Sequence, residues 1–195
     1  ANMSTTSVAV NSGSIQSNTK VFQARFASQT SPYLDWTGNL FAFPISPNLS
    51  VNTSTSNAIW QAALQLDTTL SGTGWQSFPT FTWNNSSSLP PKGVTFTWSS
   101  LNATQQADLE QYWASLTTVQ QAPFGNQATY GKAVLNFLKG DQSQSQANGG
   151  IFRNRSMLMG DIVDSSPLYV GLPAVYDGIS APGGSTNATL AAYSA

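Results

Sequence analysis

The chain has 195 residues, of which 40% are hydrophobic and only 8% are charged, and its net charge is −1. This length is sufficient for one domain with a substantial core, or for two small ones. The chain contains no His and no Cys, so the usual catalytic triads, disulfides and thiolate chemistry are excluded. With only 7 Lys and Arg and no basic cluster, no nucleic-acid partner is expected.

The composition also points to a location. The polar surface must come from Ser, Thr, Asn and Gln, because charged residues are far below the roughly 25% usual for soluble domains. That balance is typical of extracellular bacterial proteins and of β-rich surface proteins. No apolar run approaches the roughly 20 residues needed to cross a bilayer, so no membrane span is predicted.

The first part of the chain predicts strands. Residues 1–18 are small and polar, which indicates a mobile tail or a segment ordered by its neighbours. Residues 21–26 and 36–43 read as two antiparallel strands separated by a loop. Residues 78–83 and 94–98 are aromatic-rich and read as two further strands.

Three helices are predicted. The first runs to about Leu70, is capped by Ser56 or Asn57, and carries Ile59, Ala63, Leu66 and Leu70 on one face. The second covers about residues 102–116, with Leu109, Tyr112, Trp113 and Leu116 buried. The third covers about residues 129–139, with Tyr130, Val134, Phe137 and Leu138 as its apolar face and an end at Lys139 and Gly140. The expected fold class is therefore α+β, an antiparallel β-rich region with about three helices.

Charge is concentrated late in the chain. Arg153, Arg155, Asp161 and Asp164 fall within twelve positions, just before and inside a strand-like run at residues 162–170. Charges beside a buried strand are costly unless they are paired. The four residues are therefore predicted to form a structural network of ion pairs and hydrogen bonds, with a ligand site as the alternative.

The same region carries a family resemblance. A Gly-rich turn is followed by Phe152-Arg153 and Arg155, then by Leu158 with Gly160-Asp161-Ile162-Val163, then by Ser165-Ser166-Pro167 and a strand ending Val170-Gly171. Upstream, the segments at 36–43, 60–63 and 137–141 match in order. Together these motifs resemble the PilC/PilY family of type IV pilus tip adhesins and assembly proteins, over roughly residues 19–171.

The resemblance implies an organisation. After the flexible tail that the composition indicates at 1–18, it places a mixed α/β region at 19–160 and the first strand of a C-terminal β-propeller within 161–195. A single propeller strand leaves unpaired edges, so it is expected to pair with further chain or with another subunit. The family's calcium loop is an Asp-rich run that this sequence lacks, so no metal site and no other cofactor is carried over to it.

The other possible functional sites are disfavoured. Asp161 and Asp164 are three residues apart, a spacing that puts them on opposite faces of a strand, so a pair of catalytic carboxylates is disfavoured. Asp141 offers a single carboxylate where calcium sites use several. Most of the six tryptophans are expected to pack in the core rather than to stack on sugars: Trp36, Trp60, Trp75, Trp83, Trp98 and Trp113.

The expected function is therefore binding rather than catalysis. The resemblance implies an exported, non-enzymatic protein at the cell surface or pilus tip, with the outer membrane or periplasm as the alternative location. It is expected to contact minor pilins or the remainder of the propeller and to attach to a host or abiotic surface. The alternative is a self-associating subunit of another extracellular filament or surface layer. A carbohydrate hydrolase is disfavoured, because Glu110 is the chain's single Glu.

Overall fold

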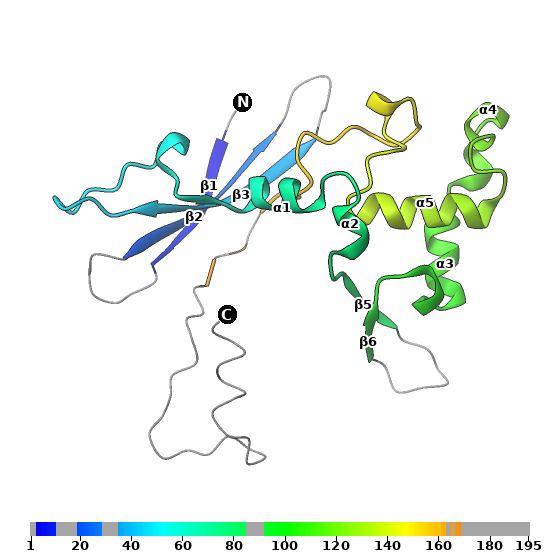
Figure 1. Cartoon of the computed structure of the whole chain (residues 1–195), viewed down its shortest axis with the longest axis horizontal. Coiled ribbons are helices and arrows are strands. Elements are labelled where there is room, and N and C mark those ends of the chain that lie inside the picture. Colours follow the sequence, from blue (N-terminus) through cyan, green and yellow to red (C-terminus); the bar gives the residue numbers. More distant parts are fainter. Residues whose placement is uncertain are drawn as a thin grey trace, which may run out of the picture.

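A computed structural model describes residues 3–10, 19–28, 35–84, 92–162, 165 and 167–168. A four-stranded antiparallel sheet lies at one end of the molecule and a helical region at the other, with α1 and α2 between them (Figure 1). The strands are β1 Met3–Val10, β2 Lys20–Ser28, β3 Trp36–Pro44, β4 Trp60–Gln61, β5 Phe81–Asn84 and β6 Lys92–Thr95. The α-helices are α1 Ala62–Leu70, α2 Gly74–Ser77, α3 Ala103–Glu110, α4 Thr118–Gln121 and α5 Gln127–Lys139.

The expected α+β class is confirmed, with antiparallel sheets and three helices of eight or more residues in the described part of the chain. The large sheet has the order β1-β2-β3-β4, and β2 pairs with β3 along its whole length, with Ala24 opposite Leu40. Residues 3–10, expected as a tail that is either mobile or ordered by its neighbours, pair with β2 as an outer strand. No propeller is seen in the described residues, and most of the predicted propeller strand at 162–170 lies outside them.

Strand β3 is covered on both of its faces. Successive side chains of a strand point to opposite faces, yet the stretches 37–39 and 41–43 of β3 are buried throughout. On one face the guanidinium of Arg25 lies 4.9 Å from the ring of Phe41 and 5.3 Å from that of Phe43. On the other face, Gly38 lies so close to the returning chain that an added Cβ would stand 2.6 Å from Cγ1 of Ile162. Only glycine fits at this crossing.

Asn39 positions α1 on the sheet. Its side-chain oxygen accepts a hydrogen bond from the N–H of Ala63 at 3.0 Å, in the first turn of the helix. The helix begins after β4, with Gln61 as its N-cap, so the expectation of a cap at Ser56 or Asn57 is wrong. Ile59, expected on the buried face of this helix, precedes it and is 53% exposed.

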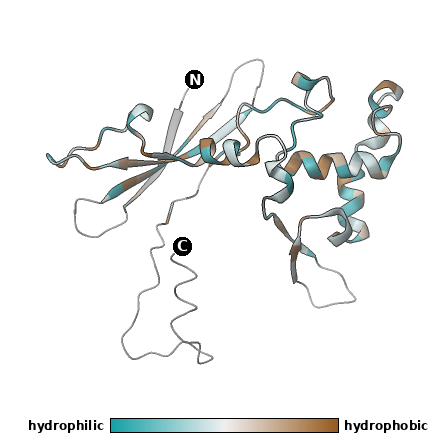
Figure 2. Ribbon diagram, in the orientation of Figure 1, coloured by the Kyte–Doolittle hydropathy of each residue, from teal (hydrophilic) through white to brown (hydrophobic). Residues whose placement is uncertain are grey.

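The longest helix, α5, follows its sequence pattern closely. Hydrophobic and hydrophilic residues interleave along it (Figure 2). Tyr130 and Phe137 are buried, and Gly140 ends the helix with φ of 120°, as the predicted Lys139–Gly140 end requires. Leu138, however, is 52% exposed.

The helix expected over 102–116 is shorter than predicted. Asn102 caps α3, and the predicted periodicity breaks where the helix ends at Glu110 and a tight 3₁₀ turn follows at Trp113–Ser115. Tyr112 is consequently 63% exposed rather than buried.

The expectation that most of the six tryptophans pack in the core is also wrong, because three of them stand at the surface: Trp36 at 58% exposure, Trp60 at 39% and Trp83 at 58%. Trp83 lies on β5, which forms a two-stranded sheet with β6. A two-stranded sheet packed on one face leaves its other face to solvent.

Candidate functional site

Residues 152–162, here called the linker, connect the helical region to the sheet (Figure 1). The linker leaves the helical region, passes the end of α1 and reaches β3 (Figure 1). Its first residue, Phe152, packs into an aromatic cluster of the helical region, with its ring 4.9 Å from that of Phe137 and 6.1 Å from those of Phe124 and Tyr130. The backbone of Phe152 is held as well, because its N–H donates to Gln144 O at 2.8 Å.

Arg155 fixes the linker to the end of α5. Its Nη1 donates to the carbonyl of Phe137 at 3.0 Å, and its guanidinium carbon lies 3.8 Å from the centre of the Phe137 ring. A cation at the last carbonyls of a helix interacts favourably with the helix dipole. Burial lowers the pKa of Arg155 to about 10, with a smaller contribution from the charge of Arg153, so the side chain remains charged at neutral pH.

Two carboxylates fix the next part of the linker. Asp35, which is buried immediately before β3, accepts the N–H of Ser156 at 2.9 Å and its hydroxyl at 3.1 Å. Asp67 on α1 accepts the N–H of Leu158 at 2.8 Å. These bonds join parts of the chain that are 121 and 91 residues apart, so the linker ties the sheet and α1 to the helical region.

The four charged residues predicted as a network occupy different surroundings. Arg155 is half-buried and anchored as described, whereas Arg153 and Asp161 are exposed and make no hydrogen bond or ion pair within the described residues. Asp164 lies outside the described residues. The four-residue network therefore stays a prediction. Sequence reasoning missed Asp35 and Asp67, because isolated carboxylates far from the linker give no local signal.

Buried charge in this protein is matched by neutral groups. Arg25 donates to the side-chain oxygen of Gln23 at 2.8 Å and to the carbonyl of Thr53, and burial lowers its pKa. Arg155 and Asp35 follow the same rule, with a carbonyl and a serine as partners. Hydrogen bonds to charged groups are stronger than neutral ones, so each of these charges anchors a segment of the chain.

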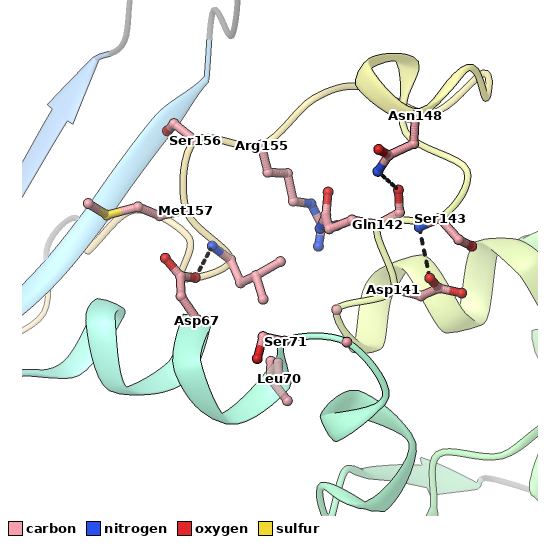
Figure 3. Close-up of a pocket in the computed structure, with 13 residues that line it drawn as sticks. Asp67, Leu70, Ser71, Asp141, Gln142, Ser143, Asn148, Arg155, Ser156 and Met157 are labelled. Atoms are coloured by element: carbon pink, nitrogen blue, oxygen red, sulfur yellow. Dashed lines mark hydrogen bonds between the residues drawn. The ribbon is translucent and has the colours of Figure 1, made fainter.

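An open pocket of about 510 Å³ lies between the end of α1, the loop after α5 and the linker (Figure 3). Asp67 and Leu70 of α1, Asp141 and Gln142 of the loop, and Arg155 of the linker line it. The pocket thus brings together polar and charged side chains from three separate segments. Within the described residues no group of three or more His, Cys, Asp or Glu side chains is arranged to hold a metal ion.

No helix in the described part of the chain is both long and apolar enough to cross a membrane. Neither a protein-family model nor a solved structure matches the chain.

One curated protein is similar to part of the chain. The type IV pilus biogenesis factor PilY1 homolog of Xylella fastidiosa is 46% identical to it over 63 residues, which cover 31% of this chain and 5% of that protein. The resemblance to the PilC/PilY family that the motifs indicated is thereby confirmed.

Proposed function

We propose that this chain is a segment of a non-enzymatic type IV pilus tip adhesin and assembly factor at the cell surface. The observation that carries the proposal is the 46% identity over 63 residues to a pilus biogenesis factor. The motif run at 152–171 resembles the same family. The anchored linker supports a scaffold role, because its residues hold segments of the fold together by hydrogen bonds and ring contacts.

The partners we propose are minor pilins and the remainder of a propeller, together with a host or abiotic surface. The exposed aromatic residues of β5, Phe81 at 69% and Trp83 at 58%, support a role in protein binding. Aromatic side chains are enriched in protein interfaces, where they contribute much of the binding energy. Phe81 and Trp83 are therefore the first residues to substitute in a binding experiment.

We further propose that Arg153, Asp161 and Asp164 act structurally rather than catalytically, together with the anchored Arg155. Arg153 and Asp161 are both exposed, and Asp161 lies between Gly160 and Ile162, the residues that cross Gly38 of β3. A propeller packed against the linker would supply them with partners. Asp161→Ala is then expected to lower the amount of secreted full-length protein. A well-secreted variant that lacks only adhesion would contradict the structural role.

The proposal is tested in the organism that carries the gene. A tagged full-length protein is expected to recover minor pilins in a pull-down, and deletion of the gene is expected to remove surface pili. Complementation with the double variant Phe81→Ala and Trp83→Ala should reduce pilin recovery. The matched control is Val119→Ala, which removes another exposed apolar side chain, on α4.

Normal piliation after deletion, together with a pull-down that recovers no pilin, would refute the proposed function. Recovery that is equal in the double variant and in the Val119→Ala control would instead refute only the role of the β5 face. Polymerisation of the purified chain on its own would favour a subunit of another filament or surface layer.

A further inference from the structure

The pocket beside the linker contains two hydrogen-bond donors without acceptors. Nε of Arg155 and Nε2 of Gln142 are both buried and have no partner. Figure 3 shows these two side chains extending toward one another from the linker and from the loop after α5. Buried donors are nearly always paired in folded proteins, so two of them on one wall require an explanation.

The charge of Arg155 is also uncompensated. Its guanidinium bonds to a neutral carbonyl and stacks on the Phe137 ring, and no carboxylate of the described residues forms an ion pair with it. Burying a cation without an anion is costly, and burial lowers the pKa of this side chain accordingly. The Nε atom itself is covered by the surrounding protein.

The pocket offers acceptors as well. Asp67 and Asp141 both line it, and each has one oxygen occupied by a backbone N–H, from Leu158 and Ser143 respectively. Their second oxygens make no hydrogen bond within the described residues. Two carboxylates repel a multiply charged anion, but they bind a ligand that presents hydroxyl or ammonium donors.

We propose that this pocket binds a small ligand carrying one carboxylate with hydrogen-bond donors beside it, as in an acidic sugar or an α-amino acid. The carboxylate pairs with Arg155 and Gln142, and the neighbouring donors pair with Asp67 and Asp141. A volume of about 510 Å³ lies within the usual range for small-molecule sites. Both donors are covered in this structure, so binding requires the Gln142 side chain to change rotamer. This binding does not depend on the pilus function proposed above.

The experiment follows the arginine side chains of the whole chain by ¹H–¹⁵N NMR. Arg25, Arg153 and Arg155 are its three arginines, so their Nε–H signals can be assigned by substitution. The probes are D-glucuronate and glycine, with D-glucose as a matched control that lacks the carboxylate and acetate as one that lacks the donors. Phosphate tests whether the pocket prefers an anion of higher charge.

We expect glucuronate or glycine to shift the Arg155 Nε–H signal in a saturable manner, and which of them does so identifies the class of ligand. Acetate is expected to bind at least about tenfold more weakly, glucose should have no effect, and the Arg25 signal should stay in place. Gln142→Ala, a change at the pocket edge, is expected to weaken binding by about tenfold, the equivalent of one hydrogen bond.

Several results would overturn the proposal. They are an unshifted Arg155 signal with every probe, equal shifts at Arg155 and at the exposed Arg153, or tighter binding of phosphate than of either carboxylate. Unchanged affinity in Gln142→Ala, in a variant whose other signals match the parent protein, would also overturn it. Arg155→Gln provides a second check, and its remaining amide signals report whether the fold survives.

Discussion

Asp35 is the most informative position to perturb, because it anchors the linker to the sheet. Its buried carboxylate accepts both the N–H and the hydroxyl of Ser156. Each hydrogen bond to a charged group contributes about 1.5–3 kcal/mol, so Asp35→Ala is expected to cost about 3 kcal/mol or more. For a chain of this size that loss lowers Tm by roughly 6–12 °C, at roughly 2–4 °C per kcal/mol.

Two further variants separate the hydrogen bonds from the loss of charge. Ser156→Ala keeps the N–H bond and removes only the hydroxyl, so it is expected to cost about 1.5–3 kcal/mol, less than Asp35→Ala. Asp108→Ala removes an exposed carboxylate from α3 and should change the free energy of unfolding by less than about 0.5 kcal/mol. Unfolding in urea, followed by tryptophan fluorescence, measures all three. If Asp35→Ala loses no more stability than Asp108→Ala, the linker is not held by this carboxylate.

Three other predictions concern the linker crossing, the small sheet and the helical core. Gly38→Ala is expected to cost about 1–3 kcal/mol by overpacking against the backbone of the crossing chain, whereas Gly93→Ala, whose new methyl meets open space, should be neutral in thermal unfolding. Asn102→Ala removes both the cap of α3 and a bond to the β5–β6 sheet, so it should cost more in urea unfolding than Asn126→Ala, which removes only the cap of α5. Burial, and then the charge of Tyr112, raise the pKa of Tyr130. The stability that the neutral Tyr130 side chain contributes is therefore complete below about pH 10, and it is lost as the pH rises through the raised pKa of the folded protein. Tyr130→Phe should therefore lose less stability than the parent between about pH 10 and pH 12; an equal loss in urea unfolding would contradict this.

The sequence predicted the structure correctly where a local pattern of residues determines it. The β2–β3 pair and the end of α5 at Gly140 follow from alternation and from a cap that needs positive φ. The prediction failed where the apolar spacing continues past the end of a helix. Tyr112 keeps the helical spacing, but α3 has already ended before it. Contacts such as that of Asp35 with Ser156 could not be predicted, because no local sequence pattern indicates a partner 121 residues away.

The charge cluster shows why a motif can indicate a family without indicating a binding site. The linker residues that carry the resemblance make contacts within the fold: Phe152 packs in the helical core, and Arg155 binds the end of α5. Residues held in this way tolerate few changes, because each replacement leaves a buried partner unpaired. Surfaces that bind partners are instead exposed, as Trp83 is. What the protein adheres to is therefore expected to depend on such exposed residues, and substitutions in the linker should alter the amount of folded protein before they alter its specificity.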